Sequence, residues 1–148
     1  MNDLGTVSAV FYGVLVEALA QAGADTPKML ADMGVAPDSL GNPDGRIAAD
    51  AVFRTFLEAP ARTGDDAFGL HAAESVPEGA FEVLEYATRT SPTVREGLER
   101  VGRYYALVHE RTEVRVEEAG ETARVTHRLR APIEAPRTHV RTSSLESS

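Results

Sequence analysis

The spacing of apolar residues changes near position 110, and this change constrains the fold more than any other feature of the sequence. Before it, apolar residues recur at steps of four, three, four and three, on one face of a helix: Val94, Leu98, Val101, Tyr105 and Val108. After it, apolar and charged residues alternate, which is the period of a half-buried β-strand. The chain therefore needs both helices and paired strands.

A Ser91-Pro92 pair interrupts two helical patterns. We expect one helix over residues 80–89 and a second one beginning at this pair, because serine is a good N-cap and proline suits the first helical turn. Similar patterns predict helices over residues 7–19, 27–33, 47–62 and 65–75. Thr26 is the expected cap of the 27–33 helix, and Arg46-Ile47 is a possible short extended segment.

The alternating region predicts a β-hairpin with its turn at Ala119-Gly120. This turn would set Val116 opposite Ala123 and Val114 opposite Val125 on an apolar face that also carries His127 and Leu129. The outer face would be polar: Glu113, Arg115, Glu117, Arg124, Thr126 and Arg128. The predicted fold class is α+β, mostly α-helical with a small antiparallel hairpin near the C-terminus.

Length and composition indicate one compact domain. The 148 residues are 43% hydrophobic, enough for one core. We place this domain at residues 1–130 and expect an irregular tail at 131–148, because Pro132, Pro136 and the serine-rich end do not suit a packed element. The absence of cysteine excludes disulfides and Cys-ligated metals.

The N-terminal segment does not fit a signal peptide. Asp3 and Glu17 interrupt the pattern that an exported protein needs, and no apolar run reaches the ~18 residues of a membrane span. We therefore expect a cytoplasmic protein with no membrane partner.

Direct DNA binding is not expected. The net charge is −8 with a single lysine, whereas DNA affinity comes largely from basic residues that neutralise phosphates. The segment TPKMLADMGVAPDSL is similar to a helix-turn-helix, but Gly41, Pro43 and Gly45 interrupt its second helix. A short helix followed by a turn is the simpler interpretation.

Enzyme chemistry has no clear motif in this chain. His71 and Glu74 have a spacing that suits a shared metal ion, but no second pair accompanies them, and a histidine on a helix surface is the commoner case. The glycines form no phosphate-binding loop. We expect no catalytic residue, no metal and no cofactor.

Three segments follow one another in an order and spacing that point to a known family. They are GVAPDSLGNPDGRI at 34–47, TGDDAFGLHAAE at 63–74 and ATRTSPTVREGLERVGRYY at 87–105. On these segments, residues 7–130 resemble the arabinose-binding-type N-terminal domain of AraC/XylS-family transcription regulators. The resemblance implies an effector-sensing domain that is followed by a DNA-binding domain with two helix-turn-helix units.

The sequence departs from the family pattern after Leu129, where the family's further helices and DNA-binding domain are expected. We therefore expect an excised fragment or a truncated product of a regulator. The expected partners are a small-molecule effector and either a homodimer or a full-length regulator. The alternative is a dimerisation or protein-interaction module that binds no ligand.

If the domain senses an effector, its aromatic residues are the first candidates for ligand contact, because their hydroxyl groups can orient a ligand in an apolar pocket. Ordinary core packing is the alternative for each, above all for Tyr105, which lies in the apolar stripe. The candidates are Tyr12, Phe81, Tyr86, Tyr104 and Tyr105.

Overall fold

The computed structural model describes residues 4–129, which divide into two compact units between Glu82 and Val83. The first unit is mostly helical with a short sheet, and the second combines helices with a β-hairpin. The predicted α+β fold class is thereby confirmed. The predicted tail at 131–148 lies outside the described residues, and the single regulatory domain at 1–130 stays a prediction.

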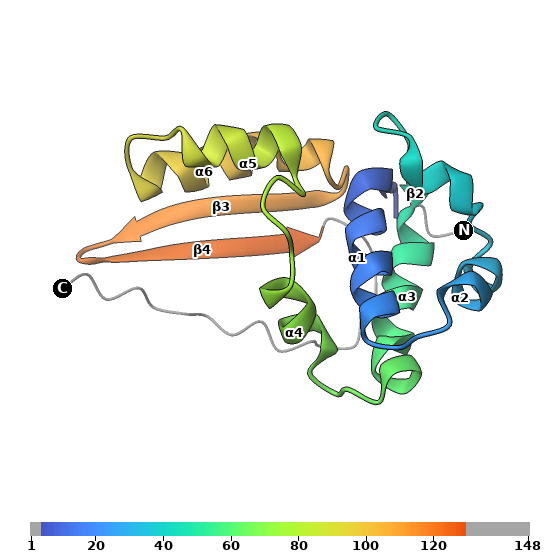
Figure 1. Ribbon diagram of the computed structural model, residues 1–148. Coiled ribbons are helices and arrows are strands. Elements are labelled where there is room, and N and C mark those ends of the chain that lie inside the picture. Colours follow the sequence, from blue (N-terminus) through green and yellow to red (C-terminus); the bar gives the residue numbers. More distant parts are fainter. Residues whose placement is uncertain (1–3, 130–148) are drawn as a thin grey trace. The chain divides into compact units, whose positions relative to one another are not determined.

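Two helices lie side by side in the first unit, α1 (Ala9–Gln21) and α3 (Ala49–Thr63) (Figure 1). Each follows a short strand, β1 (Thr6–Ser8) or β2 (Arg46–Ala48), and the strands pair antiparallel with Val7 opposite Ile47. The extended segment at Arg46-Ile47 is confirmed. The predicted helix start at Val7 is wrong, because Val7 pairs in the strand and Ser8 caps α1 by accepting the N–H of Phe11.

The remaining helices of this unit are short: α2 (Thr26–Met33), the 3-10 helix η1 (Pro37–Gly41) and α4 (Phe68–Glu74). Asp25, not Thr26, caps α2, because its carboxylate accepts the N–H of Lys28 at 3.0 Å. The turn at Gly34 is followed by the 3-10 helix η1 and not by a second α-helix of a helix-turn-helix. The predicted short helix and turn are thereby confirmed.

The first unit contains the main core. Among the described residues, every buried apolar side chain lies between Leu4 and Phe68. On α3, Val52 is buried, whereas the apolar residues Phe56 and Leu57 of the same helix are 40% and 58% exposed. The guanidinium of Arg62 on α3 binds Asp32 of α2 at 3.0 Å as well as Glu58, which ties α2 to α3.

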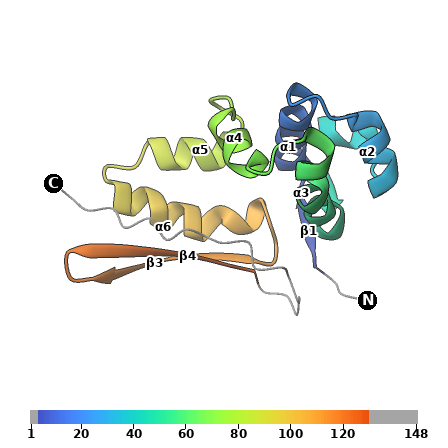
Figure 2. The same cartoon turned by 90° about the horizontal axis from the view of Figure 1, so that it is seen from below.

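In the second unit, α6 (Val94–Tyr104) lies between α5 (Glu82–Arg89) and the hairpin of β3 (Thr112–Ala119) and β4 (Thr122–Leu129) (Figure 2). The Arg100 guanidinium donates to the Ala87 carbonyl of α5 at 3.1 Å. On the other side, Gly102 approaches β3 so closely that a Cβ there would lie 2.6 Å from the Val114 carbonyl oxygen. The two predicted helices are confirmed, and α6 lies against the hairpin.

Thr93, not Ser91, caps α6. The Thr93 hydroxyl accepts the N–H of Glu96 at 3.2 Å, while the Ser91 hydroxyl donates to the Ala87 carbonyl at the end of α5. The helix also ends earlier than the apolar stripe indicated. Tyr105 begins a 3-10 turn, η2 (Tyr105–Leu107), and Val94 in the first turn of α6 is 74% exposed.

The hairpin has the predicted faces but a different register. Val116 lies opposite Val125 and Val114 opposite His127, two residues from the predicted pairing. The turn is Gly120-Glu121 rather than Ala119-Gly120, and Gly120 adopts a φ of 65°, which glycine tolerates at no steric cost. Because the shift is an even number of residues, the apolar side chains stay on one face.

Candidate functional site

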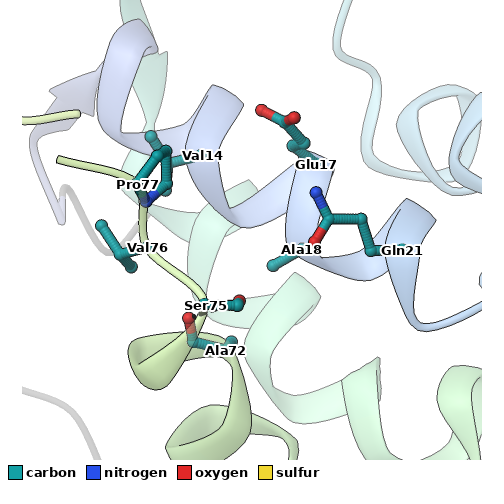
Figure 3. Close-up of a pocket in the computed structure, with 8 residues that line it drawn as sticks. All are labelled: Val14, Glu17, Ala18, Gln21, Ala72, Ser75, Val76 and Pro77. Carbon is teal, nitrogen blue, oxygen red and sulfur yellow. Dashed lines mark hydrogen bonds between the residues drawn. The ribbon is translucent and has the colours of Figure 1, made fainter. Parts of the chain in front are cut away.

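A small cavity in the first unit lies between α1 and the chain that follows α4. We call it the α1–α4 cavity; its volume is about 110 Å³. Figure 3 shows four lining residues on α1 and four on the segment from the end of α4 to Pro77. They are Val14, Glu17, Ala18 and Gln21 on α1, and Ala72, Ser75, Val76 and Pro77 on the second segment.

The two faces of α1 explain one wall of this cavity. Tyr12, Leu15, Val16 and Leu19 are buried on one face, and the cavity residues lie about half a turn away on the other. Ala18 leaves space between the larger residues of this second face. One face of α1 therefore packs in the core, and the opposite face lines the cavity.

The other wall forms because α4 stops. The Ser75 hydroxyl donates to the Ala72 carbonyl at 2.9 Å and satisfies one group of the last turn. Pro77 has no N–H to continue a helix and disfavours helical geometry at Val76, so the chain leaves α4 here. Ser75, Val76 and Pro77 thereby reach the cavity.

The polar groups of the cavity are mostly hydrogen-bond acceptors. The Glu17 carboxylate only accepts, and the Ser75 hydroxyl uses its proton on Ala72. The Gln21 amide can donate and accept. Within the part of the chain that the structure describes, neither the Glu17 nor the Gln21 side chain hydrogen-bonds to another residue. These groups are therefore available to a small ligand.

The five aromatic residues predicted to contact a ligand do not line this cavity. Tyr12 is fully buried, and its hydroxyl bonds to the Thr55 hydroxyl at 2.8 Å. Thr55 donates in turn to the Ala51 carbonyl, so the Tyr12 hydroxyl is the donor of the pair. Burial raises the pKa of Tyr12 despite this bond. Tyr12 holds α1 against α3.

Phe81 lies in the same unit and stacks on Phe11 of α1, with ring centroids 5.9 Å apart. Both rings are half-buried. This contact fastens the end of the first unit to α1 and accounts for Phe81 as a packing residue.

The other three candidates belong to the second unit. Tyr86 on α5 is 72% exposed and Tyr104 at the end of α6 is 39% exposed. Tyr105 is half-buried edge-on to His127 with ring centroids 5.6 Å apart, and burial raises its pKa. The role of the five residues in ligand binding stays a prediction.

Sequence reasoning missed the α1–α4 cavity for an identifiable reason. Glu17 and Gln21 have the spacing of an ordinary solvent-facing side of an amphipathic helix. Nothing local to α1 indicates that residues 72–77 return to cover that side. Pro77 signals where α4 must end, but not the direction that the chain then takes.

The outer face of the hairpin matches the prediction in full. A shallow hollow of about 200 Å³ is lined by the six predicted residues: Glu113, Arg115, Glu117, Arg124, Thr126 and Arg128. The register sets Glu113 opposite Arg128 and Glu117 opposite Arg124, and Glu113 also pairs with Arg115 along the strand. Cross-strand pairing of opposite charges stabilises this face.

Two histidines have opposite pKa shifts. His71 Nδ1 lies 2.7 Å from the Asp65 carboxylate, and this hydrogen bond raises the pKa of His71 and lowers that of Asp65. Partial burial beside Tyr105 lowers the pKa of His127. The raised pKa means that protonated His71 stabilises the fold below its ordinary pKa, and that this contribution is lost as pH rises through the raised value.

We therefore expect His71 to titrate above, and His127 below, the ordinary histidine value of about 6.5. Imidazole proton shifts measured by NMR across the pH range give both midpoints. Asp65→Asn should lower the His71 midpoint and leave His127 unchanged, whereas Asp66→Asn, which removes a neighbouring charge, should have a smaller effect. Equal midpoints for the two histidines would contradict these assignments.

No helix among residues 4–129 is long and apolar enough to cross a membrane. The same residues contain no cluster of three or more histidine, aspartate or glutamate side chains that could bind a metal ion.

Comparison with known proteins identifies the family. Residues 23–147 match the model of the family described as the arabinose-binding domain of AraC transcription regulators, at their N-terminus. No curated protein matched the chain. The match covers α2 to β4 and continues past the hairpin, so it includes the helix pair on which the resemblance depended. The chain belongs to the family of N-terminal arabinose-binding domains of AraC transcription regulators.

Proposed function

We propose that this chain is the effector-sensing domain of an AraC-type transcription regulator and that it binds a small organic ligand without transforming it. The family match over residues 23–147 is the observation that carries the proposal. The α1–α4 cavity is a candidate place for a small ligand, since it presents the polar groups of Glu17, Gln21 and Ser75 beside apolar side chains.

The proposed mechanism is a population shift. A ligand that binds one packing of α1 and α4 more tightly than another favours that packing. The α1 helix also carries Tyr12, whose hydroxyl bonds to Thr55 of α3 in the core. A displacement of α1 would therefore change its packing against α3. The change would then alter how an attached DNA-binding domain is presented to its operator.

The test uses both the chain and the full-length regulator. Small metabolites are screened by thermal shift on the chain, and each one that raises the melting temperature is then tested for its effect on operator binding by the regulator. We expect at least one compound to do both. If no compound changes either melting or operator binding, the sensing function is wrong.

A second candidate function is a protein-interaction module that needs no ligand. It is favoured by the exposed apolar residues of the second unit, where Val94, Tyr86 and Leu107 are 74%, 72% and 62% exposed. The molar mass in solution, measured by sedimentation with and without the screened metabolites, separates the two functions. A ligand-independent dimer together with no hit in the screen would favour the interaction module.

A further inference from the structure

We propose that the outer edge of β4 pairs antiparallel with β4 of a second copy of this chain, with Val125 on the twofold axis. The two hairpins then form one four-stranded sheet. This inference goes beyond the proposed sensing function and holds whether or not the chain binds a ligand. Three observations carry it: the direction of the backbone groups of β4, the uncovered apolar side of this strand, and a register that sets no like charges opposite each other.

The turn of the hairpin determines which backbone groups of β4 point outward. Ala119 and Thr122 flank the two-residue turn as a hydrogen-bonded pair, and such pairs alternate with non-hydrogen-bonded pairs along an antiparallel ladder. Ala123, Val125 and His127 therefore point their N–H and C=O groups away from β3. In the part of the chain that the structure describes, no strand pairs with this edge. The edge also lacks the bulge, proline or lysine that commonly prevents further pairing.

The opposite edge of the hairpin is already occupied. The Thr112 N–H, which points away from β4, donates to the His109 carbonyl at 3.3 Å. The Val114 carbonyl also points outward, and α6 approaches it so closely that a Cβ on Gly102 would lie 2.6 Å from this oxygen. A strand therefore cannot be added beside β3 without displacing α6, which leaves β4 as the edge for pairing.

The apolar side of β4 lacks the cover that β3 has. Val114 and Val116 of β3 are half-buried, with α6 lying against this strand (Figure 2). On the same face of β4, Ala123 is exposed and Val125 is 43% exposed. Within residues 83–129, no apolar side chain is buried. A two-stranded hairpin is marginal in water, so a four-stranded sheet with a continuous apolar face is the more stable arrangement.

The arginines of β4 select the register. Two identical antiparallel strands pair symmetrically about one residue, and a residue near either end of β4 gives a short overlap. Symmetry about Thr126 would set Arg124 opposite the partner's Arg128, and like charges directly opposite are destabilising. Symmetry about Val125 instead sets each arginine opposite a threonine of the partner. Arg124 then lies opposite the partner's Thr126. Arg128 lies opposite the partner's Thr122.

Sedimentation equilibrium of the 148-residue chain over a range of concentrations measures the association. We expect a monomer–dimer equilibrium that Val125→Lys weakens about tenfold or more, because two lysines would lie side by side at the axis. Val94→Lys makes the same change at a valine of α6 that is 74% exposed. It should alter the dissociation constant less than about twofold. Circular dichroism verifies that both variants keep the fold.

Disulfide formation tests the register, because the chain has no cysteine of its own. Val125→Cys places two thiols opposite each other at a Cα separation of about 5.5 Å, within the range that a disulfide spans. Thr122→Cys, at an exposed position on the same strand, leaves the two thiols six residues or about 20 Å apart along the pair. We expect mild oxidation to convert Val125→Cys to a covalent dimer and to leave Thr122→Cys monomeric.

Hydrogen exchange identifies the occupant of the edge. The amides of Ala123, Val125 and His127 should become more protected as the concentration of the chain rises. Protection that does not change with concentration would mean that a segment of the same chain covers this edge, and would overturn the inference. The same holds for a chain that stays monomeric, for equal oxidation of the two cysteine variants, and for a dimer that Val94→Lys disrupts and Val125→Lys does not. Failure of the sensing function appears elsewhere, in the metabolite screen.

Discussion

Leu19→Ala is expected to lower the free energy of unfolding by about 2–5 kcal/mol. Leu19 lies on the buried face of α1 and has no exposed surface, so its removal leaves a cavity inside the only part of the described chain with fully buried apolar side chains. Urea unfolding followed by circular dichroism measures the change.

Leu70→Ala is the matched control, since Leu70 is a leucine in a helix of the same unit but is 73% exposed. We expect a loss below about 0.5 kcal/mol for this variant, as for most surface substitutions. If the two leucines respond equally, the buried face assigned to α1 is wrong. Leu19 points away from the α1–α4 cavity, so this result tests the fold and not the ligand site.

Gly102→Ala is expected to lower the free energy of unfolding by about 1–3 kcal/mol, although alanine is the better helix former. The added Cβ would lie 2.6 Å from the Val114 carbonyl oxygen, which belongs to the backbone of β3 and cannot rotate away. Either α6 or the strand must move. Chemical denaturation monitored at the tyrosines of the second unit reports the loss.

Gly69→Ala makes the same substitution inside α4, where nothing lies within 4 Å of the added carbon. Here the helix preference is unopposed, and we expect a gain of about 0.5–1 kcal/mol. The two substitutions should therefore have opposite signs. A gain for both would mean that α6 does not approach β3 as closely as described.

The aromatic residues predicted to contact a ligand do not line the α1–α4 cavity. Aromatic side chains were the natural first candidates, because tyrosine combines an apolar ring with a polar hydroxyl. Tyr12 is fully buried and bonded to Thr55, and Phe81 stacks on Phe11, while their role in ligand binding stays a prediction. The acceptors that face a cavity come from Glu17, Gln21 and Ser75, residues whose types and spacing are those of an ordinary surface.

The position of α1 gives this cavity a route to the rest of the unit. Glu17 and Leu19 are two residues apart on the same helix, one at the cavity and the other in the core. In the mechanism that we propose, a ligand that moves the Glu17 side of α1 would also displace the packed side of this helix, because a helix is stiff. This is the physical basis on which a small site can influence a large core.

Local periodicity alone determined most of the secondary structure. The helix pair around Ser91-Pro92, the two faces of the hairpin and the break after Gly34 follow from spacing, because side-chain direction repeats every 3.6 residues in a helix and every two in a strand. Even the shifted register kept the right faces, since it moved by two residues. The family resemblance depended on the same local order of segments.

Tertiary structure decided what depends on contacts between distant residues. Val7 lies in a strand and not in the predicted helix, because it pairs with Ile47. The Tyr12 hydroxyl is buried against Thr55, which lies 43 positions away in the sequence. The α1–α4 cavity exists because residues 72–77 return to a helix that ended at Gln21. A local pattern shows which side of a helix is apolar, but only the folded chain determines what lies against the other side.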